Sequence, residues 1–332
     1  MKNTRLIAFL IIISLGLIVH AQTGESYKIK TGPGPEDIVI DFYDDIPKLL
    51  ISTSSRRDGY GEYSEIELYD PDTGKVKVLP RINEPRDLSF KPHGIYLIQI
   101  DNQKLLYVLL HDDVKKEHPV VRYVYQDELL IFDRIFQNEL LISPNAITVF
   151  DDGSFLVCND AAKRGNKIEQ ILGLKSGNIL FFDKAGNVNK VADKLGMPAG
   201  MNRIGKKIFV SCATENKIFS FDFRNKQLQN KSLLTRIKGP DNIRVSEGTL
   251  YVANHPKMLK FIKHIKNAKN LSPSSIFTID PSSGNKHNIF LNSGEKISAV
   301  SVAIPHKNSL YIGQIFENYI LKVENQSIKN PG

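Results

Sequence analysis

The sequence predicts an all-β fold, a six-bladed β-propeller with short lid helices over the mouth of its central channel. The first observation behind this prediction is a sequence motif that recurs six times, in which a short polar pair precedes an apolar strand. The motif recurs every 42 to 57 residues, and two further strands follow it each time. Turn sequences such as those at 70–75 and 280–285 separate these strands. Self-similarity at this period is typical of a radial β-repeat, and six units predict six blades.

Each repeat supplies three strands in a fixed order. The second strands are predicted at 49–54, 105–111, 155–160, 208–213, 250–255 and 310–315, and the third strands at 65–70, 120–125, 178–183, 217–222, 275–280 and 319–324. The first strands surround the channel, so matching positions on them form rings. The leading residues are Glu36, His93, Asn145, Ala199, Asp241 and Ser298, and the residues beside them are Asp37, Gly94, Ala146, Gly200, Asn242 and Ala299.

The chain has the length of one propeller, which we assign to residues 22–324. The last repeat shows only three strands, whereas 26–30 is a strand without a repeat of its own. We predict that 26–30 pairs as the outer strand of the sixth blade, which would close the ring and protect a sheet edge. Residues 325–332 are expected to form a flexible tail.

The first 21 residues are predicted to be a secretory signal peptide. Lys2 and Arg5 precede an apolar run at 6–19, and Ala21 ends a small-residue cleavage site. The run is short for a membrane span, and a retained segment acting as a tether is the alternative. A secreted or periplasmic protein is therefore expected. Removal of Lys2 and Arg5 lowers the formal net charge from +8 to +6.

The leading residues of the first strands indicate a metal site. Glu36, Asn145, Asp241 and Asn242 would bring carboxylate and amide oxygens together in a narrow channel, where they repel one another unless a cation neutralises them. Oxygen ligands without thiolates favour Ca²⁺ over Zn²⁺. The alternative is turn and cap chemistry, in which each side chain bonds to nearby backbone N–H groups.

Two histidines are predicted to act beside this cation. His93 stands in the leading ring, and His111 ends the second strand of the same blade, which a hairpin brings close to it. We interpret His93 as a general base and His111 as its helper. A structural role is the usual reading of a single histidine. His255 holds the position of His111 in the fifth repeat and is expected to face the same cavity.

Two segments are predicted to form lid helices. Residues 257–269 have apolar residues at helical spacing and lysines largely elsewhere, and 161–174 follows a strand end. We favour packing of 257–269 over the channel mouth, and contact with an anionic membrane surface is the alternative. Such lids line an apolar pocket and suit an ester or lactone substrate.

Other chemistries lack support in the sequence. No zinc-ligand spacing, phosphate-binding glycine loop or Gly-x-Ser-x-Gly elbow is present, and aromatic and basic residues are not interleaved as nucleic-acid binding requires. Cys158 and Cys212 lie on second strands of adjacent repeats. Their offset register favours buried thiols, and a disulfide is the alternative.

These residues resemble the serum paraoxonase/arylesterase family, calcium-dependent six-bladed propellers that hydrolyse lactones and aryl esters. The resemblance spans most of the mature chain and lies in the order and spacing of short motifs, since no single motif is specific. The motifs are at 34–37, 90–95, 144–150, 171–174, 241–245 and 254–256.

The resemblance implies roles for individual residues. Glu36, Asn145, Asp241 and Asn242 match ligands of a catalytic calcium, and His93 and His111 match a proposed dyad of general base and partner. Asp37 and the carbonyl of Ile95 match ligands of a deeper, structural calcium. Two positions depart from the family pattern: Ala199 replaces an Asn on the catalytic ion, which water or Asn202 could replace, and Ala146 replaces an Asp on the structural ion.

The function expected from these features is calcium-dependent hydrolysis of small carboxylic esters or lactones. Calcium would polarise the substrate carbonyl, and His93 would activate water. A sugar lactonase of the gluconolactonase type is the first alternative. The second is an exported, non-enzymatic ligand-binding propeller whose metal site has eroded at Ala199 and Ala146. No nucleic-acid partner is expected.

Overall fold

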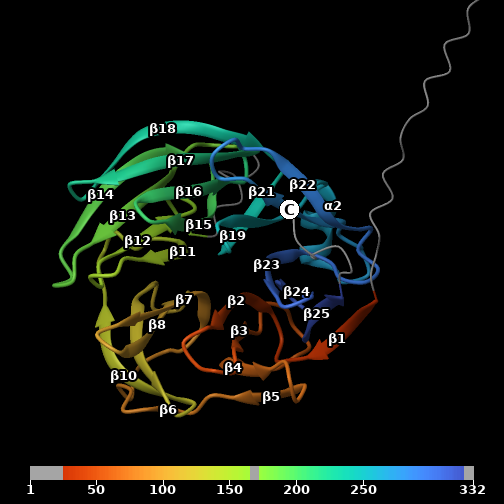
Figure 1. Cartoon of the computed structure of the whole chain (residues 1–332), viewed down its shortest axis with the longest axis horizontal. Coiled ribbons are helices and arrows are strands. Elements are labelled where there is room, and N and C mark those ends of the chain that lie inside the picture. Colours follow the sequence, from red (N-terminus) through yellow and green to blue (C-terminus); the bar gives the residue numbers. More distant parts are fainter. Residues whose placement is uncertain (1–24, 165–171, 325–332) are drawn as a thin grey trace, which may run out of the picture.

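The computed structural model describes residues 25–164 and 172–324, and it confirms the six-bladed propeller (Figure 1). Each blade is an antiparallel sheet whose first strand lies at the channel. Blade 1 contains β2 (Pro35–Asp41), β3 (Lys48–Ser54), β4 (Ser64–Asp70) and β5 (Lys75–Val78); blade 2 contains β7 (Pro92–Ile100), β8 (Gln103–Leu110), β9 (Val120–Gln126) and β10 (Leu129–Phe136); blade 3 contains β11 (Pro144–Val149), β12 (Phe155–Asn159), β13 (Gly177–Phe182) and β14 (Val188–Leu195).

The second half of the ring repeats this order. Blade 4 contains β15 (Pro198–Ile204), β16 (Lys207–Cys212), β17 (Lys217–Arg224) and β18 (Gln227–Arg236); blade 5 contains β19 (Pro240–Ser246), β20 (Thr249–Asn254), β21 (Ser274–Ile279) and β22 (Lys286–Asn292); blade 6 contains β23 (Val300–His306), β24 (Ser309–Gln314) and β25 (Tyr319–Glu324). A short strand that the sequence did not predict, β6 (Arg81–Ile82), pairs parallel with β10.

The ring is closed by the strand that precedes the first repeat. β1 (Ser26–Lys30) pairs antiparallel with β25 as the outermost strand of blade 6, from Ser26 opposite Val323 to Lys30 opposite Tyr319. Main-chain hydrogen bonds extend this contact, including one of 2.9 Å from the N–H of Glu324 to the carbonyl of Glu25. The prediction for 26–30 is therefore confirmed. Among the described residues, backbone pairing closes the propeller.

Every innermost strand has a register shift at its beginning. The shift follows Pro35, Pro92, Pro144, Pro198 and Pro240 in blades 1 to 5, and it follows Val300 in blade 6. Because a β-bulge leaves one residue unpaired and re-aims its side chain, the shift turns the leading residues toward the channel. It also corrects the predicted ring. The residue after the blade 6 shift is Ser301, whereas Ser298 precedes the strand and bonds to Gly294 and Ser272.

Side chains from one blade hold the leading strand of the next. The hydroxyl of Ser52 donates to the carbonyl of His93 at 2.6 Å, and that of Ser211 donates to the carbonyl of Asp241 at 2.7 Å. The inner strands also approach closely, because a Cβ on Gly94 would lie 2.7 Å from the carbonyl oxygen of Asn145. The inner strands therefore form a tightly connected ring in which a glycine is needed where neighbours meet.

The core consists of apolar clusters between neighbouring blades. One contains Leu50 and Val108 of blades 1 and 2, and another contains Cys158 and Cys212 of blades 3 and 4. Both cysteines are buried and unpaired, so the disulfide alternative is not realised in this structure. Burial raises the pKa of each thiol to about 12. The thiol of Cys158 donates to the carbonyl of Pro198 at 3.3 Å, the same cross-blade contact that serine makes elsewhere.

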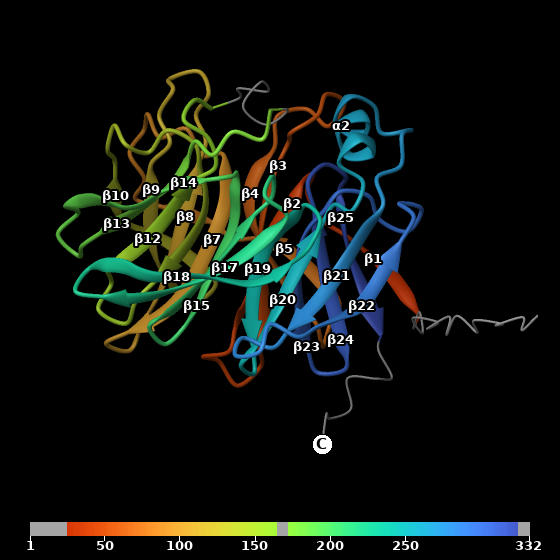
Figure 2. The same cartoon turned by 90° about the horizontal axis from the view of Figure 1, so that it is seen from above.

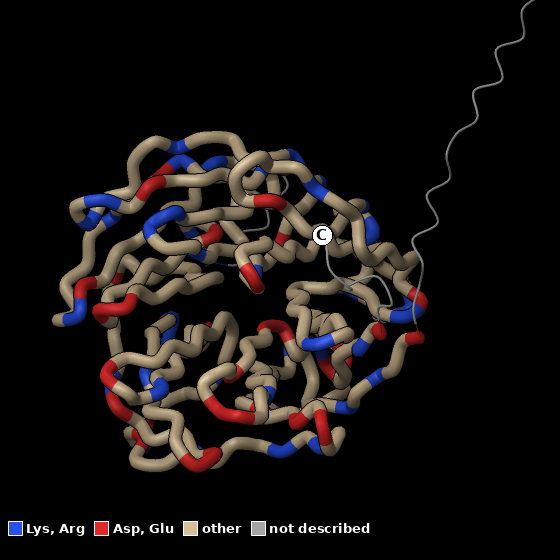
Figure 3. Tube along the Cα trace, in the orientation of Figure 1, with Lys and Arg blue, Asp and Glu red and all other residues tan. Residues whose placement is uncertain are grey.

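Helix α2 (Met258–Lys266) lies at one end of the propeller (Figure 2) and confirms the helix predicted within 257–269, whereas its packing over the channel mouth stays a prediction. Half of the proposed helix in 161–174, residues 165–171, lies outside the described part of the chain, as do the predicted signal peptide and tail. A search of the described residues finds no helix long and apolar enough to span a membrane. Basic and acidic residues are both distributed around the outside of the blades (Figure 3).

Candidate active site

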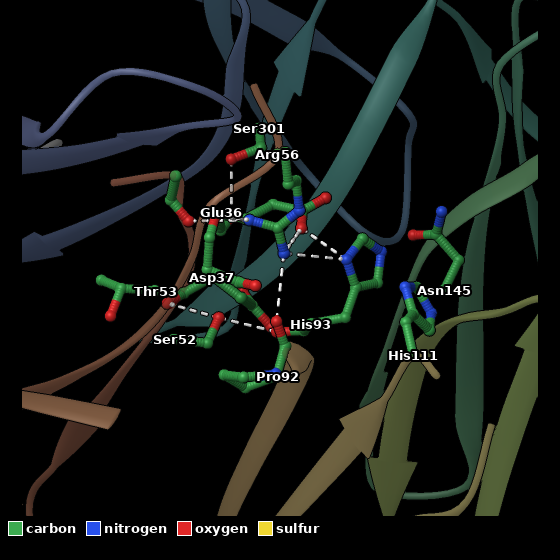
Figure 4. Close-up of polar contacts among 12 residues, drawn as sticks. Glu36, Asp37, Ser52, Thr53, Arg56, Pro92, His93, His111, Asn145 and Ser301 are labelled. Carbon is green, nitrogen blue, oxygen red and sulfur yellow. Dashed lines mark hydrogen bonds and ion pairs between the residues drawn. The ribbon is translucent and has the colours of Figure 1, made fainter. Parts of the chain in front are cut away.

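Three side chains of blades 1 and 2 come together in what we call the Glu36 cluster: Glu36, Arg56 and His93 (Figure 4). Glu36 and His93 follow the first residues of β2 and β7, and Arg56 follows β3. Glu36 Oε2 lies 2.5 Å from both Arg56 Nη2 and His93 Nδ1. Arg56 is itself fixed by three backbone carbonyls, those of Gly34 at 2.8 Å, Pro92 at 3.1 Å and Ser54 at 3.3 Å. The cluster is therefore a buried carboxylate shared by a fixed cation and an imidazole.

The charge of Glu36 follows from these neighbours. Burial opposes ionisation, but the Arg56 guanidinium and the His93 ring outweigh it and lower the pKa of Glu36 to about 2. The carboxyl is thus ionised at neutral pH. His93 Nδ1 contacts both this carboxylate and Arg56 Nη2, the latter at 3.2 Å. In the tautomer whose Nδ1–H faces the carboxylate, Nε2 carries the lone pair.

His111 stands beside His93, as predicted, with ring centroids 4.2 Å apart (Figure 4). Its Nε2 lies 2.6 Å from the carbonyl of Pro144, to which it must donate. Its Nδ1 accepts from Arg164 Nη2 at 2.8 Å. Burial, His93 and Arg164 all lower the pKa of His111 well below its usual value, so the ring is neutral. With both nitrogens occupied, His111 is arranged to hold and orient His93.

The other predicted oxygen ligands lie on β11 and β19. Asn145 donates through Nδ2 to Asp160 at 3.2 Å, so its amide oxygen faces away from that bond. Asp241 Oδ2 lies 3.0 Å from Nε2 of the buried His255. Burial raises the pKa of Asp241, and the contact with His255 opposes this shift. Asn242, next along β19, is also buried.

A cation at this position would depend on amide as well as carboxylate oxygens. Within residues 25–164 and 172–324, no group of three or more His, Cys, Asp and Glu side chains gathers to hold a metal ion. The oxygens of Glu36, Asp241, Asn145 and Asn242 form a donor set of the hard kind that Ca²⁺ accepts. Both ion pairs of Glu36 use Oε2. The donor set therefore fits calcium, with Arg56 as a fixed positive charge beside it.

The two residues predicted for a structural calcium are arranged differently. Asp37 Oδ1 is ion-paired to Arg244 Nη2 and accepts from the N–H of Ile38 at 3.0 Å, while Asp37 Oδ2 accepts from the N–H of Ile95 at 2.8 Å. The same Arg244 nitrogen donates to the carbonyl of Ile95 at 3.1 Å. We call Asp37, Ile95 and Arg244 the Asp37 cluster. A guanidinium contacts both of the predicted metal ligands, so this cluster does not fit a second metal ion.

An apolar cavity of about 390 Å³ lies beneath α2. Its lining includes Met197 and Ala213 of blade 4, Phe261 and Ile262 of the helix, and His255. The ring of Phe261 stacks on that of His255 with centroids 4.1 Å apart. His255 therefore contacts both this cavity and Asp241, whereas His93 and His111 do not line the cavity, and it stays a prediction that His255 faces the same cavity as these two histidines.

The helix is fastened over this cavity by charged groups. Arg57 bonds to Glu317 Oε1 at 2.8 Å and donates to the carbonyl of His264 at 2.6 Å, and the buried His264 ring lies 3.4 Å from the same carboxylate. These contacts join α2 to the loops of blades 1 and 6. In this position Met258, Phe261 and Ile262 line the cavity, whereas Leu259 is 78% exposed.

Sequence reasoning missed the two arginines of the channel. Arg244 had a signal, because it lies two residues beyond Asn242 on one strand and alternate residues share a face. Arg56 and Arg57 are adjacent, and one turns to Glu36 while the other turns to Glu317. Nothing in the sequence distinguishes those two directions.

A six-bladed propeller with a carboxylate, a histidine pair and oxygen donors around its channel defines a class of channel-centred propeller proteins. Within that class, this chain belongs to the arylesterase family, whose model matches residues 64–322. It is 24% identical over 245 residues to serum paraoxonase/arylesterase 2 of Rattus norvegicus, covering 69% of this chain and 67% of that protein. It is 26% identical over 249 residues to the Homo sapiens protein of the same name, covering 71% and 70%.

The fold is also similar to that of a solved gluconolactonase from Xanthomonas campestris. The two share 14% sequence identity with a TM-score of 0.55, over 92% of this chain and 87% of the other. Similarity at this identity concerns the fold alone. Membership of the arylesterase family supports a hydrolase of the esterase or lactonase kind that acts on small molecules.

Proposed function

We propose that this chain is a calcium-dependent hydrolase of carboxylic esters and lactones, active after export from the cell. The observation that carries the proposal is the position of His93, whose Nδ1 lies against the ionised Glu36. In the proposal this contact keeps the proton on Nδ1, and Nε2 accepts a proton from water. Family membership gives the reaction class. The apolar cavity beside Asp241 and His255 gives a place for an apolar substrate.

In the proposed reaction, His93 Nε2 accepts a proton from water while the oxygen of that water attacks the substrate carbonyl carbon. Glu36 stabilises the imidazolium that forms, as a carboxylate partner does for a catalytic histidine. When the tetrahedral intermediate collapses, the imidazolium returns its proton to the departing alkoxide or phenoxide. His111, neutral and fixed by Pro144 and Arg164, keeps the His93 ring in position.

Calcium bound by Glu36, Asn145, Asp241 and Asn242 would supply the positive charge that polarises the carbonyl and stabilises the developing oxyanion. The chain's own contribution to this charge is Arg56, which stands beside the same carboxylate. Ala199 contributes no oxygen at its ring position. The buried Asn202 donates through Nδ2 to the carbonyl of Ile243 at 3.1 Å, and its Oδ1 accepts from the N–H of Arg203 at 2.8 Å, so water is the better candidate for the vacant ligand position.

The cavity favours an aryl or aliphatic group over a sugar. Met197, Ala213, Phe261 and Ile262 present carbon atoms, against which a polyhydroxylated substrate would bury hydroxyls without partners, although Thr214, Asn216 and Lys238 also line the cavity. This argument favours an aryl ester or aliphatic lactone over the sugar lactone of the gluconolactonase alternative. Contact of 257–269 with a membrane surface stays a prediction.

The test is hydrolysis of phenyl acetate, an aliphatic lactone and a sugar lactone by the purified chain, in calcium and after chelation. Turnover of the first two that requires calcium and is lost in His93→Gln supports the proposal. Turnover that survives chelation removes calcium from it, and preference for the sugar lactone would favour the gluconolactonase alternative. A folded chain that binds calcium but hydrolyses none of the three would support the non-enzymatic propeller.

A further inference from the structure

We propose that Arg244 takes the place of the second metal ion in this propeller, so that its guanidinium is a permanent, covalently attached cation in the Asp37 cluster. The chain would then bind at most one calcium along its channel, and the connection between blades 5, 1 and 2 would need no divalent ion. This inference concerns the construction of the channel. It stands whether or not the chain hydrolyses esters.

The first argument is that the ligand positions are already used. Asp37 accepts from Arg244 and Ile38 on one oxygen and from Ile95 on the other, and the carbonyl of Ile95 accepts from the same Arg244 nitrogen. A metal ion contacting both groups would have to displace the guanidinium. The side chains of Arg244 and Asp37 are only 7% and 4% exposed, so neither has solvent to turn into.

The second argument is charge. Asp37 carries one negative charge, which one guanidinium balances. The third position implied for this ion is Ala146, which is buried in an apolar cluster with Cys158 and Met201 and supplies neither charge nor oxygen from its side chain. A divalent ion held by Asp37 alone would leave an unbalanced positive charge in a buried place, which is costly.

The third argument is that Arg244 is held in place. It projects from β19, and its neighbour Ile243 accepts a hydrogen bond of 3.1 Å from Asn202 of blade 4 while packing in an apolar cluster of blades 4 and 5. From there the guanidinium reaches β2 and β7, joining residues that are 207 and 149 positions apart in the chain. A metal ion holding Asp37 and Ile95 would join blades 1 and 2, whereas Arg244 adds blade 5.

The experiment measures calcium stoichiometry and thermal stability separately. By equilibrium dialysis, the wild-type chain should bind no more than one calcium, and Glu36→Gln should bind none. Thermal unfolding of Glu36→Gln should give the same Tm in calcium and in chelator. A calcium ion retained by Glu36→Gln but lost from Glu36→Gln/Asp37→Asn would overturn the inference. Zero calcium in the wild type would instead remove the catalytic ion of the proposed function and leave this inference intact.

Arg244→Met, in the Glu36→Gln background, tests the arginine directly. It leaves Asp37 buried without its cation, so the Tm in chelator should fall by about 5–10 °C, and calcium should restore little of the loss because Asp37 would be its only charged ligand. Asp37→Asn added to Arg244→Met removes the stranded charge, and the double change should cost less than Arg244→Met alone and be insensitive to calcium. If Arg244→Met does not fold, Arg244→Lys and the double change provide the comparison. An Arg244→Met chain as stable as its parent would overturn the inference.

Discussion

The Glu36 and Asp37 clusters begin from adjacent residues of β2, yet the arginines in them have different roles. In the Asp37 cluster, both oxygens of the Asp37 carboxylate and the carbonyl of Ile95 have partners, although Arg244 Nε has none among the described residues. In the Glu36 cluster, Arg56 keeps the carboxylate ionised while one nitrogen of His93 remains available. A buried ion pair can therefore close one position of a channel and prepare the next for chemistry. What separates the two is whether an imidazole shares the carboxylate.

Changing His93 should have the largest effect, and only on activity. His93→Gln keeps the size and polarity of the side chain but cannot accept the proton, so kcat should fall by roughly 10²- to 10⁴-fold. Steady-state kinetics on phenyl acetate, with circular dichroism and Tm as controls, measure this effect. His111→Asn is the matched control, with a smaller loss because His111 orients and does not accept. Unchanged kcat in His93→Gln would remove the difference in role between the two clusters.

The second comparison is the stability cost of each arginine. Breaking a buried pair by removing one partner costs about 3–5 kcal/mol, which we expect for Arg244→Met because Asp37 is left without a cation. Arg56→Met should cost less, since its side chain is 19% exposed and His93 remains beside Glu36. Urea unfolding at pH 7 gives both free energies. Equal costs would show that the two arginines contribute equally to the free energy of unfolding.

The third effect is on the pH dependence. The pKa of Glu36 is held at about 2, below its ordinary 4.5, so its contribution to stability is fully present above about pH 4.5 and is lost as the pH falls through about 2. Arg56→Gln removes a positive charge that lowers the pKa of Glu36. Because burial raises that pKa and is then opposed by less charge, the acid limb of kcat/KM should move to higher pH. Arg56→Lys keeps the charge and should move it less. Identical profiles for the wild type and both variants would show that Arg56 does not set the charge of Glu36.

The propeller could be predicted from the sequence because its signals are local and repeated. Alternating apolar strands and turn sequences recur with the period of the blades, and the strand at 26–30 could be recognised because it has no repeat of its own. The part of the site that depends on matching positions of the blades was predicted, since Glu36, His93 and His111 come together as expected. Ser298 was misplaced because the bulge of blade 6 lies after Val300, and periodicity alone does not locate a bulge. The partners of Arg56 and Arg244 depend on side chains that cross the channel, which no local pattern encodes.

The smallest effect concerns the support of the Glu36 cluster from the neighbouring blade. Ser52 is fully buried and donates to the carbonyl of His93, so Ser52→Ala leaves that carbonyl unsatisfied and should cost about 1 kcal/mol of unfolding free energy. Ser211→Ala removes the equivalent bond to Asp241 and should cost a similar amount. Ser52→Ala acts on the proposed base and should lower kcat by a few-fold at saturating calcium, whereas Ser211→Ala acts on a proposed calcium ligand and should mainly raise the calcium concentration needed for half-maximal activity. If both variants lower kcat equally, the cross-blade hydroxyls hold the ring as a whole, and the position of His93 depends on the entire channel rather than on its own blade.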